Sequence, residues 1–206
     1  MIKKIYFVAV LVAILMAVAS CSGLWEGVDL TDQRSVDRRL RADIAKCIPD
    51  SATVFEIRLN PSANFSKRVD VLSVTFFDRD SQAVRCRSAV LTGDYAPREV
   101  PVDPHLRERT AGGGVPLAAV DLSRIAANVA AGAKMMAAAG KPFSGIGSYT
   151  VTLDADSAAV EHRFTLDSKV VARSGVIGGG RQGVTTEYCT FDFAANSRGD
   201  VVHVGE

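Results

Sequence analysis

Apolar and polar residues alternate along several short segments of this chain, and this pattern limits the folds that it can adopt. In residues 55–59, three apolar side chains alternate with Glu56 and Arg58. A period of two places apolar side chains on one face of a strand and polar ones on the other, as in an antiparallel sheet with one solvated face. Further strands are predicted over residues 72–76, 84–90, 149–153, 160–166, 170–177, 184–193 and 201–204.

Two segments have the period of an amphipathic helix instead. The first begins at its N-cap, Asp32 or Ser35, and ends before Pro49. The second runs from Asp121 to about Ala139. The apolar stripes of the two helices consist of Val36, Leu40, Ile44 and Cys47, and of Leu122, Ile125, Val129, Ala133 and Met136.

The strands fall into two groups separated by a different kind of segment. Residues 93–118 hold four of the seven prolines and a run of three glycines, a composition typical of a linker or hinge. The pattern [F/L]-D-x-D-S-x-A-V occurs at residues 77–84 and again at 153–160, which suggests that the two sides of the linker are related. We therefore predict an α+β fold with antiparallel sheets and one amphipathic helix packed on a sheet face in each of two related halves, residues 32–92 and 119–206.

The first residues carry the three parts of a secretory signal peptide. Lys3 and Lys4 supply the positive start, residues 5–18 form a mainly apolar run, and small residues precede Cys21. The apolar run of about 14 residues is shorter than the roughly 20 that a membrane-spanning helix needs. Residues 1–20 are therefore predicted to be a signal peptide that is removed from the mature protein.

The sequence Val18-Ala19-Ser20-Cys21 resembles the lipobox of bacterial lipoproteins, in which an aliphatic residue, a small residue and then Gly, Ala or Ser precede the cysteine. The resemblance covers residues 1–21 only. It implies that the Cys21 sulfur is lipidated, that the chain is cleaved before Cys21, and that the new amino group is acylated. Two or more acyl chains hold a protein stably at a bilayer, so residues 21–31 are expected to form a short lipidated tether to the membrane.

Two features next to Cys21 indicate where such a lipoprotein resides. Ser22 stands where the inner-membrane retention signal of these lipoproteins has Asp, which favours the outer membrane. The acidic run that some surface-exported lipoproteins carry after the cysteine is missing here. We therefore expect the domain to face the periplasm.

The net charge argues against nucleic-acid binding. Loss of Lys3 and Lys4 leaves 24 − 2 = 22 basic residues against 23 acidic ones, so the mature chain has a formal charge of −1. A nucleic-acid-binding domain has a basic footprint that this chain lacks. The arginines within residues 34–41 are interleaved with aspartates, which is typical of a solvated helix face. With 48% hydrophobic residues, the chain can bury a core as one domain or as two small lobes.

Three cysteines remain once Cys21 is lipidated: Cys47, Cys86 and Cys189. Buried free thiols are the favoured interpretation, because cysteine is among the most buried residue types. A disulfide between Cys47 and Cys86, the pair nearest in sequence, is the alternative. The spacing of the cysteines forms no metal-binding cluster, so no metal site is expected.

Three other patterns are interpreted as structural. The two D-x-D-S segments indicate hairpin turns rather than calcium sites, because neither continues with the remaining ligands of a calcium loop. His162 shares a predicted strand face with apolar residues and has no nucleophile or carboxylate beside it on that face, which indicates a structural histidine. The glycine-rich residues 175–183 lack the Lys of a phosphate-binding loop and lie between strands, which indicates a hairpin loop. No cofactor is therefore expected.

We expect from these patterns a non-enzymatic binding or scaffold protein whose partner is another protein of the cell envelope. An envelope hydrolase without a recognisable motif is one alternative, and a binder of a small apolar ligand between helix and sheet is another. Loops as long as residues 93–118 are often functional. Arg107, Arg109 and Val115, which lie within that segment, are therefore the predicted contact region.

Overall fold

The computed structural model describes residues 27–93, 95–154, 159–177 and 181–205. The predicted signal peptide and the lipidation site Cys21 lie outside these residues. The described chain forms one long antiparallel sheet with helices against it, so the predicted antiparallel strands are confirmed. Within the described ranges, every helix is too short or too polar to span a bilayer.

Nine strands make up the main sheet, in the order β11-β10-β9-β8-β2-β4-β5-β6, with β7 paired to β2 off this path. All pairings in it are antiparallel. A second, two-stranded sheet consists of β1 (Val28–Asp29) and β3 (Arg68–Val69). The strands of the main sheet are β2 (Thr53–Asn60), β4 (Val71–Asp78), β5 (Ala83–Val90), β6 (Arg98–Val100), β7 (Val115–Pro116), β8 (Gly145–Asp154), β9 (Ala159–Ile177), β10 (Arg181–Ala195) and β11 (Val201–His203).

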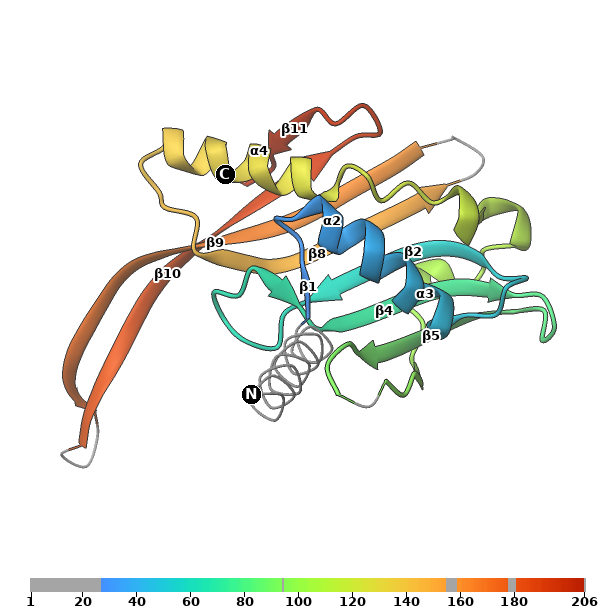
Figure 1. Ribbon diagram of the computed structural model, residues 1–206, viewed down its shortest axis with the longest axis horizontal. Coiled ribbons are helices and arrows are strands. Elements are labelled where there is room, and N and C mark those ends of the chain that lie inside the picture. Colours follow the sequence, from blue (N-terminus) through green and yellow to red (C-terminus); the bar gives the residue numbers. More distant parts are fainter. Residues whose placement is uncertain (1–26, 94, 155–158, 178–180, 206) are drawn as a thin grey trace, which may run out of the picture.

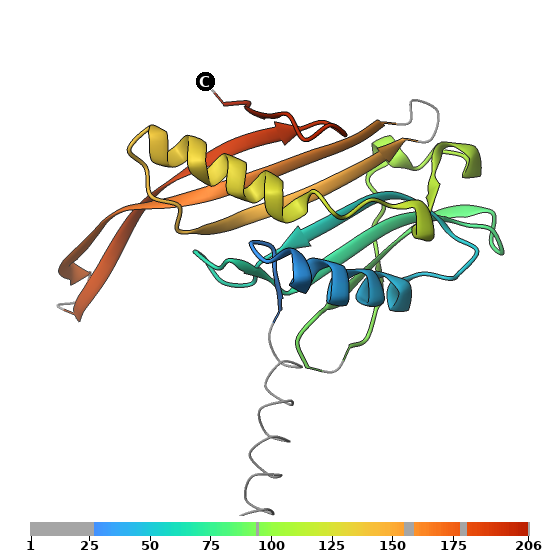
Figure 2. The same cartoon turned by 45° about the horizontal axis from the view of Figure 1, so that its top comes forward.

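The helices lie over one face of the main sheet (Figures 1 and 2). The first runs without a break from α2 (Gln33–Ser35) through a π-helical turn (Val36–Leu40) to α3 (Arg41–Cys47). Asp32 caps its start, because the Asp32 side chain accepts a hydrogen bond from the Arg34 N–H. The second, α4 (Ile125–Ala138), begins later than the predicted Asp121.

The apolar helix stripes and alternate strand residues fill the core between these layers. Each apolar side chain that becomes fully buried contributes about 1.5–3 kcal/mol. The buried helix side chains include Val36, Leu40 and Ile44 of the first helix and Ile125, Val129 and Met136 of α4. The sheet contributes Ile57, Leu59, Val74, Tyr149, Val151 and Phe164 to the same core.

The predicted tether is shorter in the structure than residues 21–31. Val28 and Leu30 are fully buried, and Val28 pairs with Val69 across the two-stranded sheet. The Leu30 N–H donates to the Lys67 carbonyl at 3.2 Å. The chain is therefore part of the fold from Val28 onward.

The two predicted halves share one sheet, because β2 of the first half pairs with β8 of the second. Leu59 lies opposite Tyr149 and Ile57 opposite Val151. All four side chains are fully buried. The core is therefore continuous between residues 32–92 and 119–206.

Residues 95–118 pack along the sheet instead of forming a free linker. β6 extends the sheet beyond β5, and β7 pairs with β2 so that Val115 lies opposite Val54. Leu106, between these two strands, is buried. Proline and glycine content indicated a linker here, but short edge strands also tolerate proline, because its missing N–H is not needed there. Pro116 occupies such a position in β7.

The close approach of Gly114 to β2 makes the packing of this segment testable. A Cβ atom added at Gly114 would lie 2.8 Å from the Thr53 hydroxyl and 2.9 Å from the Phe55 ring. Gly114→Ala should therefore lower the free energy of unfolding by about 1–3 kcal/mol. Gly113→Ala is the matched control, because a Cβ atom there meets nothing within 4 Å. Urea unfolding measures both variants, and equal stabilities would contradict the packing described here.

Candidate functional site

Two of the three predicted contact residues, Arg109 and Val115, pack within the domain. Arg109 donates from Nη1 to the Leu153 carbonyl at 3.1 Å, and its guanidinium lies 5.6 Å from the centre of the Phe55 ring. Val115 is half-buried in β7. Of the three predicted contact residues, only Arg107 has an exposed side chain. Arg109 and Val115 therefore help to hold the segment on the sheet, and contact of the segment with a partner stays a prediction.

The three described cysteines are free thiols, and no disulfide joins Cys47 to Cys86 in the structure. Cys47 ends α3, and its sulfur lies 2.9 Å from the Tyr95 Oη. Arg87 on β5 donates to the Cys47 carbonyl at 3.1 Å, so its neighbour Cys86 points to the opposite face of the sheet. Burial raises the pKa of both thiols, which keeps them protonated and poorly nucleophilic at neutral pH.

His162 belongs to a buried hydrogen-bonded group between β8, β9 and α4. Its Nδ1 lies 3.0 Å from the Tyr149 Oη, and Asn128 donates from Nδ2 to the same oxygen at 3.1 Å. All three side chains are at most 1% exposed. Burial lowers the pKa of His162 to about 4, so the ring is neutral at physiological pH. These contacts are those of a structural histidine.

The first D-x-D-S segment forms the hairpin turn between β4 and β5. The Asp78 carboxylate accepts hydrogen bonds from the Ser81 hydroxyl at 2.7 Å and the Asp80 N–H at 3.1 Å. The hydrogen bond from the Ser81 hydroxyl is the main cause that lowers the pKa of the Asp78 carboxyl group. Most of the second segment, residues 155–158, lies outside the described residues. Across the described part of the chain, no three Asp, Glu, His or Cys side chains come together as a metal site would require.

The hairpin of β9 and β10 extends well beyond the rest of the sheet (Figure 1). β8 pairs with β9 only as far as Asp167, and β11 pairs with β10 only from Phe193 onward. We call the part beyond, residues 168–177 and 181–189, the arm. Along it, each strand has only the other as its neighbour among the described strands. At about 3.3 Å per residue, the β9 strand of the arm reaches about 30 Å from the sheet.

Contacts at the base of the arm hold it to the domain. The Tyr188 ring packs edge-on against Phe65, with ring centres 5.7 Å apart. The Lys169 N–H donates to the Ser144 Oγ at 2.9 Å. Residues 175–177 and 181–183 of the glycine-rich segment lie at the far end, where Ile177 pairs with Arg181, and residues 178–180 lie outside the described ranges. This antiparallel pairing agrees with the hairpin that the glycine-rich residues predict.

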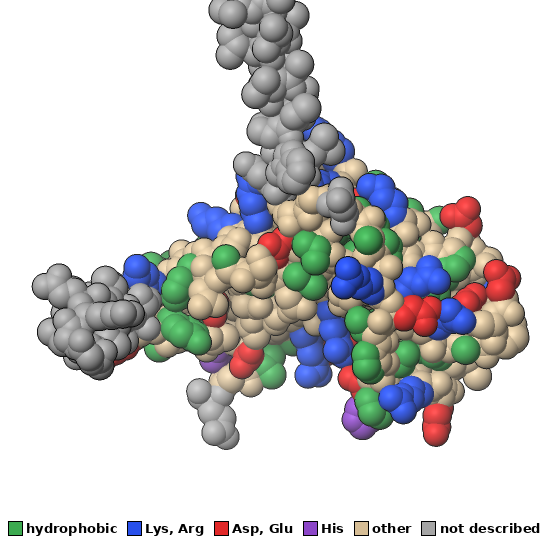
Figure 3. All heavy atoms as spheres, turned by 90° about the horizontal axis from the view of Figure 1, so that it is seen from below, with side chains coloured by type: hydrophobic (Ala, Val, Ile, Leu, Met, Phe, Trp, Pro, Cys, Tyr) green, Lys and Arg blue, Asp and Glu red, His purple; other side chains and the backbone are tan. Residues whose placement is uncertain are grey.

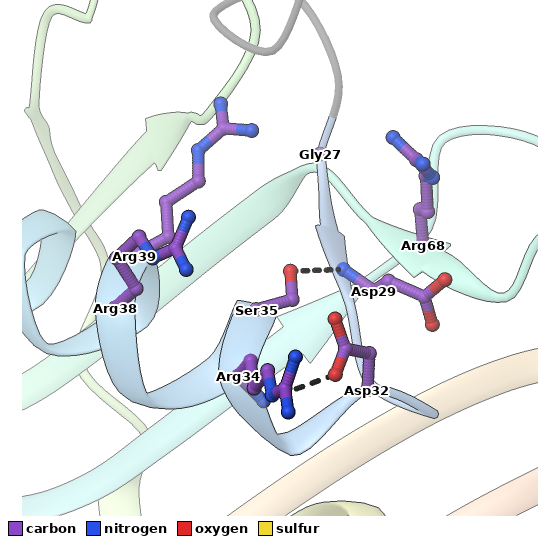
Figure 4. A pocket seen from close by; sticks show the side chains of 8 residues that line it. All are labelled: Gly27, Asp29, Asp32, Arg34, Ser35, Arg38, Arg39 and Arg68. Atoms are coloured by element: carbon purple, nitrogen blue, oxygen red, sulfur yellow. Dashed lines mark hydrogen bonds between the residues drawn. The ribbon is translucent and has the colours of Figure 1, made fainter.

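A polar hollow of about 510 Å³ lies where the described chain begins (Figure 4). We call it the basic hollow. Figure 4 shows the helix arginines on one side of β1 and Arg68 of β3 on the other. Seen from below in Figure 3, Lys and Arg side chains gather on the surface around this end of the described chain. The hollow is lined by Gly27, Asp29, Asp32, Arg34, Ser35, Arg38, Arg39 and Arg68.

The two aspartates of the basic hollow are hydrogen-bonded to groups close to them in sequence. Asp29 accepts from the Thr31 N–H at 2.9 Å and from the Thr31 hydroxyl at 2.7 Å. Asp32 caps the helix, as described above. Arg34 and Arg38, by contrast, are exposed, and their side chains have no hydrogen-bond or ion-pair partner within the described ranges. Arg34 and Arg38 therefore present guanidinium groups that no described carboxylate neutralises directly, whereas Arg39 pairs with Asp43 at 3.8 Å.

Neither the arm nor the basic hollow was predicted as a site. The helix arginines were interpreted as a solvated face, and Arg68 is remote from them in sequence. Arg34 and Arg38 are four residues apart, which places two like charges on the same side of a helix. This spacing is the local signal that could have drawn attention to them. The length of the arm depends on where β8 and β11 stop pairing, which local patterns do not reveal.

A smaller, apolar hollow of about 210 Å³ lies between α4 and the strands β10 and β11. Pockets for drug-sized ligands typically measure about 300–1,000 Å³. The hollow is therefore small for such a ligand, which does not favour the alternative of apolar ligand binding. It is lined by Met135, Met136, Ala139, Phe191, Phe193 and His203.

The chain matches no family model, and no curated protein or solved structure was found to be similar to it. Its function is therefore inferred from the arm, the basic hollow and the buried ionisable groups.

The buried His162 should make the stability of the fold sensitive to acid. The histidine has an ordinary pKa of 6.5, whereas burial in the folded protein lowers the pKa to about 4. Between these values the unfolded state binds more protons, so the free energy of unfolding falls as the pH falls. The loss from pH 7 to pH 5 due to this group is about 2 kcal/mol.

His162→Gln tests this cause, because glutamine keeps a hydrogen-bonding group beside Tyr149 but does not titrate in this range. Urea unfolding at both pH values should show a weaker pH dependence for this variant than for the wild type. The matched control is His105→Gln, which changes an exposed histidine and should keep the wild-type dependence. If the His162 variant keeps it as well, another group is responsible.

Proposed function

We propose that the mature protein is a lipid-anchored lipoprotein of the cell envelope that binds a partner protein through the arm and catalyses no reaction itself. The lipobox resemblance at Cys21 supports the anchor, and Ser22 supports an outer-membrane position facing the periplasm. Val28 follows Cys21 by 28 − 21 = 7 positions and is already paired in the fold, so the domain lies close to the bilayer. A partner that is itself attached to the membrane or the cell wall fits this position.

The arm is the observation that carries the proposal. An isolated two-stranded hairpin is only marginally stable in water. The two outer edges of the arm also present backbone N–H and C=O groups that pair with no described strand, and another strand can add to such an edge. Many complexes form when an extended segment of one protein pairs with such an edge of another. We therefore propose that the partner contributes a β-strand to the arm.

The buried ionisable side chains do not favour the alternative of an envelope hydrolase. A catalytic cysteine needs a lowered pKa and access to substrate, whereas burial raises the pKa of Cys47 and of Cys86. A general base works best when its pKa is near the ambient pH, whereas the pKa of His162 is lowered to about 4. These groups behave as core residues.

We further propose that the two halves derive from a repeated unit of one helix followed by four strands. The first unit is the helix over residues 33–47 with β2, β4, β5 and β6, and the second is α4 with β8, β9, β10 and β11. The shared order of elements, with β2 against β8 at the centre, supports this relation. The repeated eight-residue pattern does not, because residues 77–84 connect β4 to β5 whereas residues 153–160 connect β8 to β9. These two hairpins are not equivalent in the two units.

The lipid anchor is tested by Cys21→Ala, which removes the sulfur that accepts the diacylglyceryl group. Cells that make this variant and are fed a palmitate analogue should yield unlabelled precursor, because neither acylation nor cleavage follows. Cys189→Ala is the matched control, since it removes an exposed thiol of the domain and should leave labelling intact. Label that persists on the Cys21 variant would refute the lipoprotein assignment.

Binding through the arm is tested by crosslinking in living cells. A photo-crosslinking amino acid at Ser174 or at Val184, which lie opposite each other in the arm, should capture one discrete envelope protein. The control places the same amino acid at Arg107, an exposed residue of the loop that the sequence predicts as the contact region. At that position it should capture no discrete envelope protein.

Two results of this experiment would contradict the proposal. Capture of the same protein from Arg107 but not from the arm would move the contact to the loop. Capture of a second copy of this chain alone would show that arms pair with each other rather than with a partner.

A further inference from the structure

The basic hollow lies at the point where the fold continues into the tether. Gly27 lines the hollow and follows Cys21 by 27 − 21 = 6 positions, so the chain between them spans at most about 21 Å. We propose that the hollow binds the phosphate-bearing headgroup of an anionic phospholipid in the membrane that anchors the protein. This inference rests on the proposed lipid anchor, because the anchor brings the hollow to the bilayer surface.

The charge of the hollow favours an anion. Its lining holds four arginines and two aspartates, and one of the arginines, Arg39, pairs with Asp43 at 3.8 Å. The excess is therefore 4 − 1 − 2 = +1, in a mature chain whose net charge is −1. Both aspartates accept hydrogen bonds from neighbouring N–H or hydroxyl groups. Arg34 and Arg38 are like charges at helical spacing i, i+4, an arrangement that destabilises a helix unless a counter-ion is present. A bound phosphate would supply that counter-ion.

The guanidinium groups of the arginines favour phosphate over other anions. A guanidinium group donates in a planar fork that matches two oxygens of a phosphate. Arg34 and Arg38 have these donors unused within the described residues. Many arginines elsewhere on the domain pair with carboxylates instead. Such pairs are Arg58 with Glu56 at 2.7 Å, Arg85 with Asp78 at 3.2 Å, and Arg163 with Glu161 at 2.8 Å.

The backbone around the hollow is also specialised. Arg38 and Arg39 lie in the π-helical turn Val36–Leu40, and such turns within α-helices occur frequently at functional sites. On the other side, Gly27 packs so tightly on β3 that an added Cβ atom would lie 2.3 Å from the Val69 carbonyl oxygen. Only glycine permits this approach. The start of the tether is therefore held at the hollow.

The position of the hollow favours a lipid headgroup over a soluble anion. Basic residues next to a membrane anchor are attracted to the negative surface that anionic lipids create. This attraction falls off within about 10 Å at ordinary salt concentrations, so it requires that the basic groups lie next to the bilayer. Figure 3 shows Lys and Arg side chains around this end of the domain, from which the proposed tether leads to the bilayer. The lipid binds by the same guanidinium–phosphate bonds that a free phosphate would form.

The test uses the full-length lipidated protein in nanodiscs of phosphatidylcholine alone, or of phosphatidylcholine mixed with phosphatidylglycerol. A ligand that binds only the folded state raises the melting temperature. We therefore expect a Tm several degrees higher in the discs that contain phosphatidylglycerol, and a smaller difference at high salt. Circular dichroism measures the transition in both kinds of disc.

Two double variants assign the effect to the hollow. Arg34→Gln with Arg38→Gln should abolish the difference in Tm between the two discs. Arg79→Gln with Arg107→Gln removes the same charge from exposed positions outside the hollow and should preserve the difference. Inorganic phosphate added to discs of phosphatidylcholine alone should leave Tm unchanged, and a rise equal to that with phosphatidylglycerol would reveal a site for free phosphate instead.

The remaining outcomes separate this inference from the function on which it rests. A protein that does not enter either disc lacks the anchor, which overturns the lipoprotein assignment together with the headgroup site. A protein that enters both discs with the same Tm, or a hollow variant that keeps the wild-type difference, overturns the headgroup site alone.

Discussion

The antiparallel pairing of β2 with β8 is the interaction on which the rest of the structure depends. It lies at the centre of the main sheet and joins strands that are about ninety residues apart, with Ile57 opposite Val151 and Leu59 opposite Tyr149. We call this pair of strands the seam. The two helices meet above it, where Gln33 donates to the Leu122 carbonyl at 3.2 Å and accepts from the Ala126 N–H at 3.3 Å. Without this seam each half would be a small sheet with an open central edge.

The two candidate surfaces lie in different parts of the chain. β8 pairs with β9 only as far as Asp167, and the remainder of β9 leaves the sheet with β10 as the arm. The arginines of the first helix lie on one side of β1, with Arg68 of β3 on the other (Figure 4). The basic hollow is thus built from residues 27–68, and the arm from residues 168–177 and 181–189.

The sequence predicted the parts that local patterns determine. Alternation marked most of the strands, and the apolar stripe with Asp32 as its cap marked the first helix, since both signals depend on residues within one element. The pairing of β2 with β8 could not be predicted in this way, because period-two strands do not specify their neighbours. The docking of residues 95–118 was missed for a related reason. Arg109 bonds to Leu153 and stacks on Phe55, contacts that exist only once both halves share a sheet.

The arm differs from the terminal edges of the sheet in its length and its lack of interruption. A natural sheet limits unwanted association by ending in short or charged edge strands. This sheet ends in two strands of three residues, β6 and β11, and β6 carries Arg98 and Glu99. The arm is the opposite case, since its β9 strand continues for about ten residues past the last partner without a proline to interrupt it. Among the described strands, the terminal edges of the sheet are protected whereas the edge of its longest hairpin is open. That edge is where the strand of the proposed partner would pair.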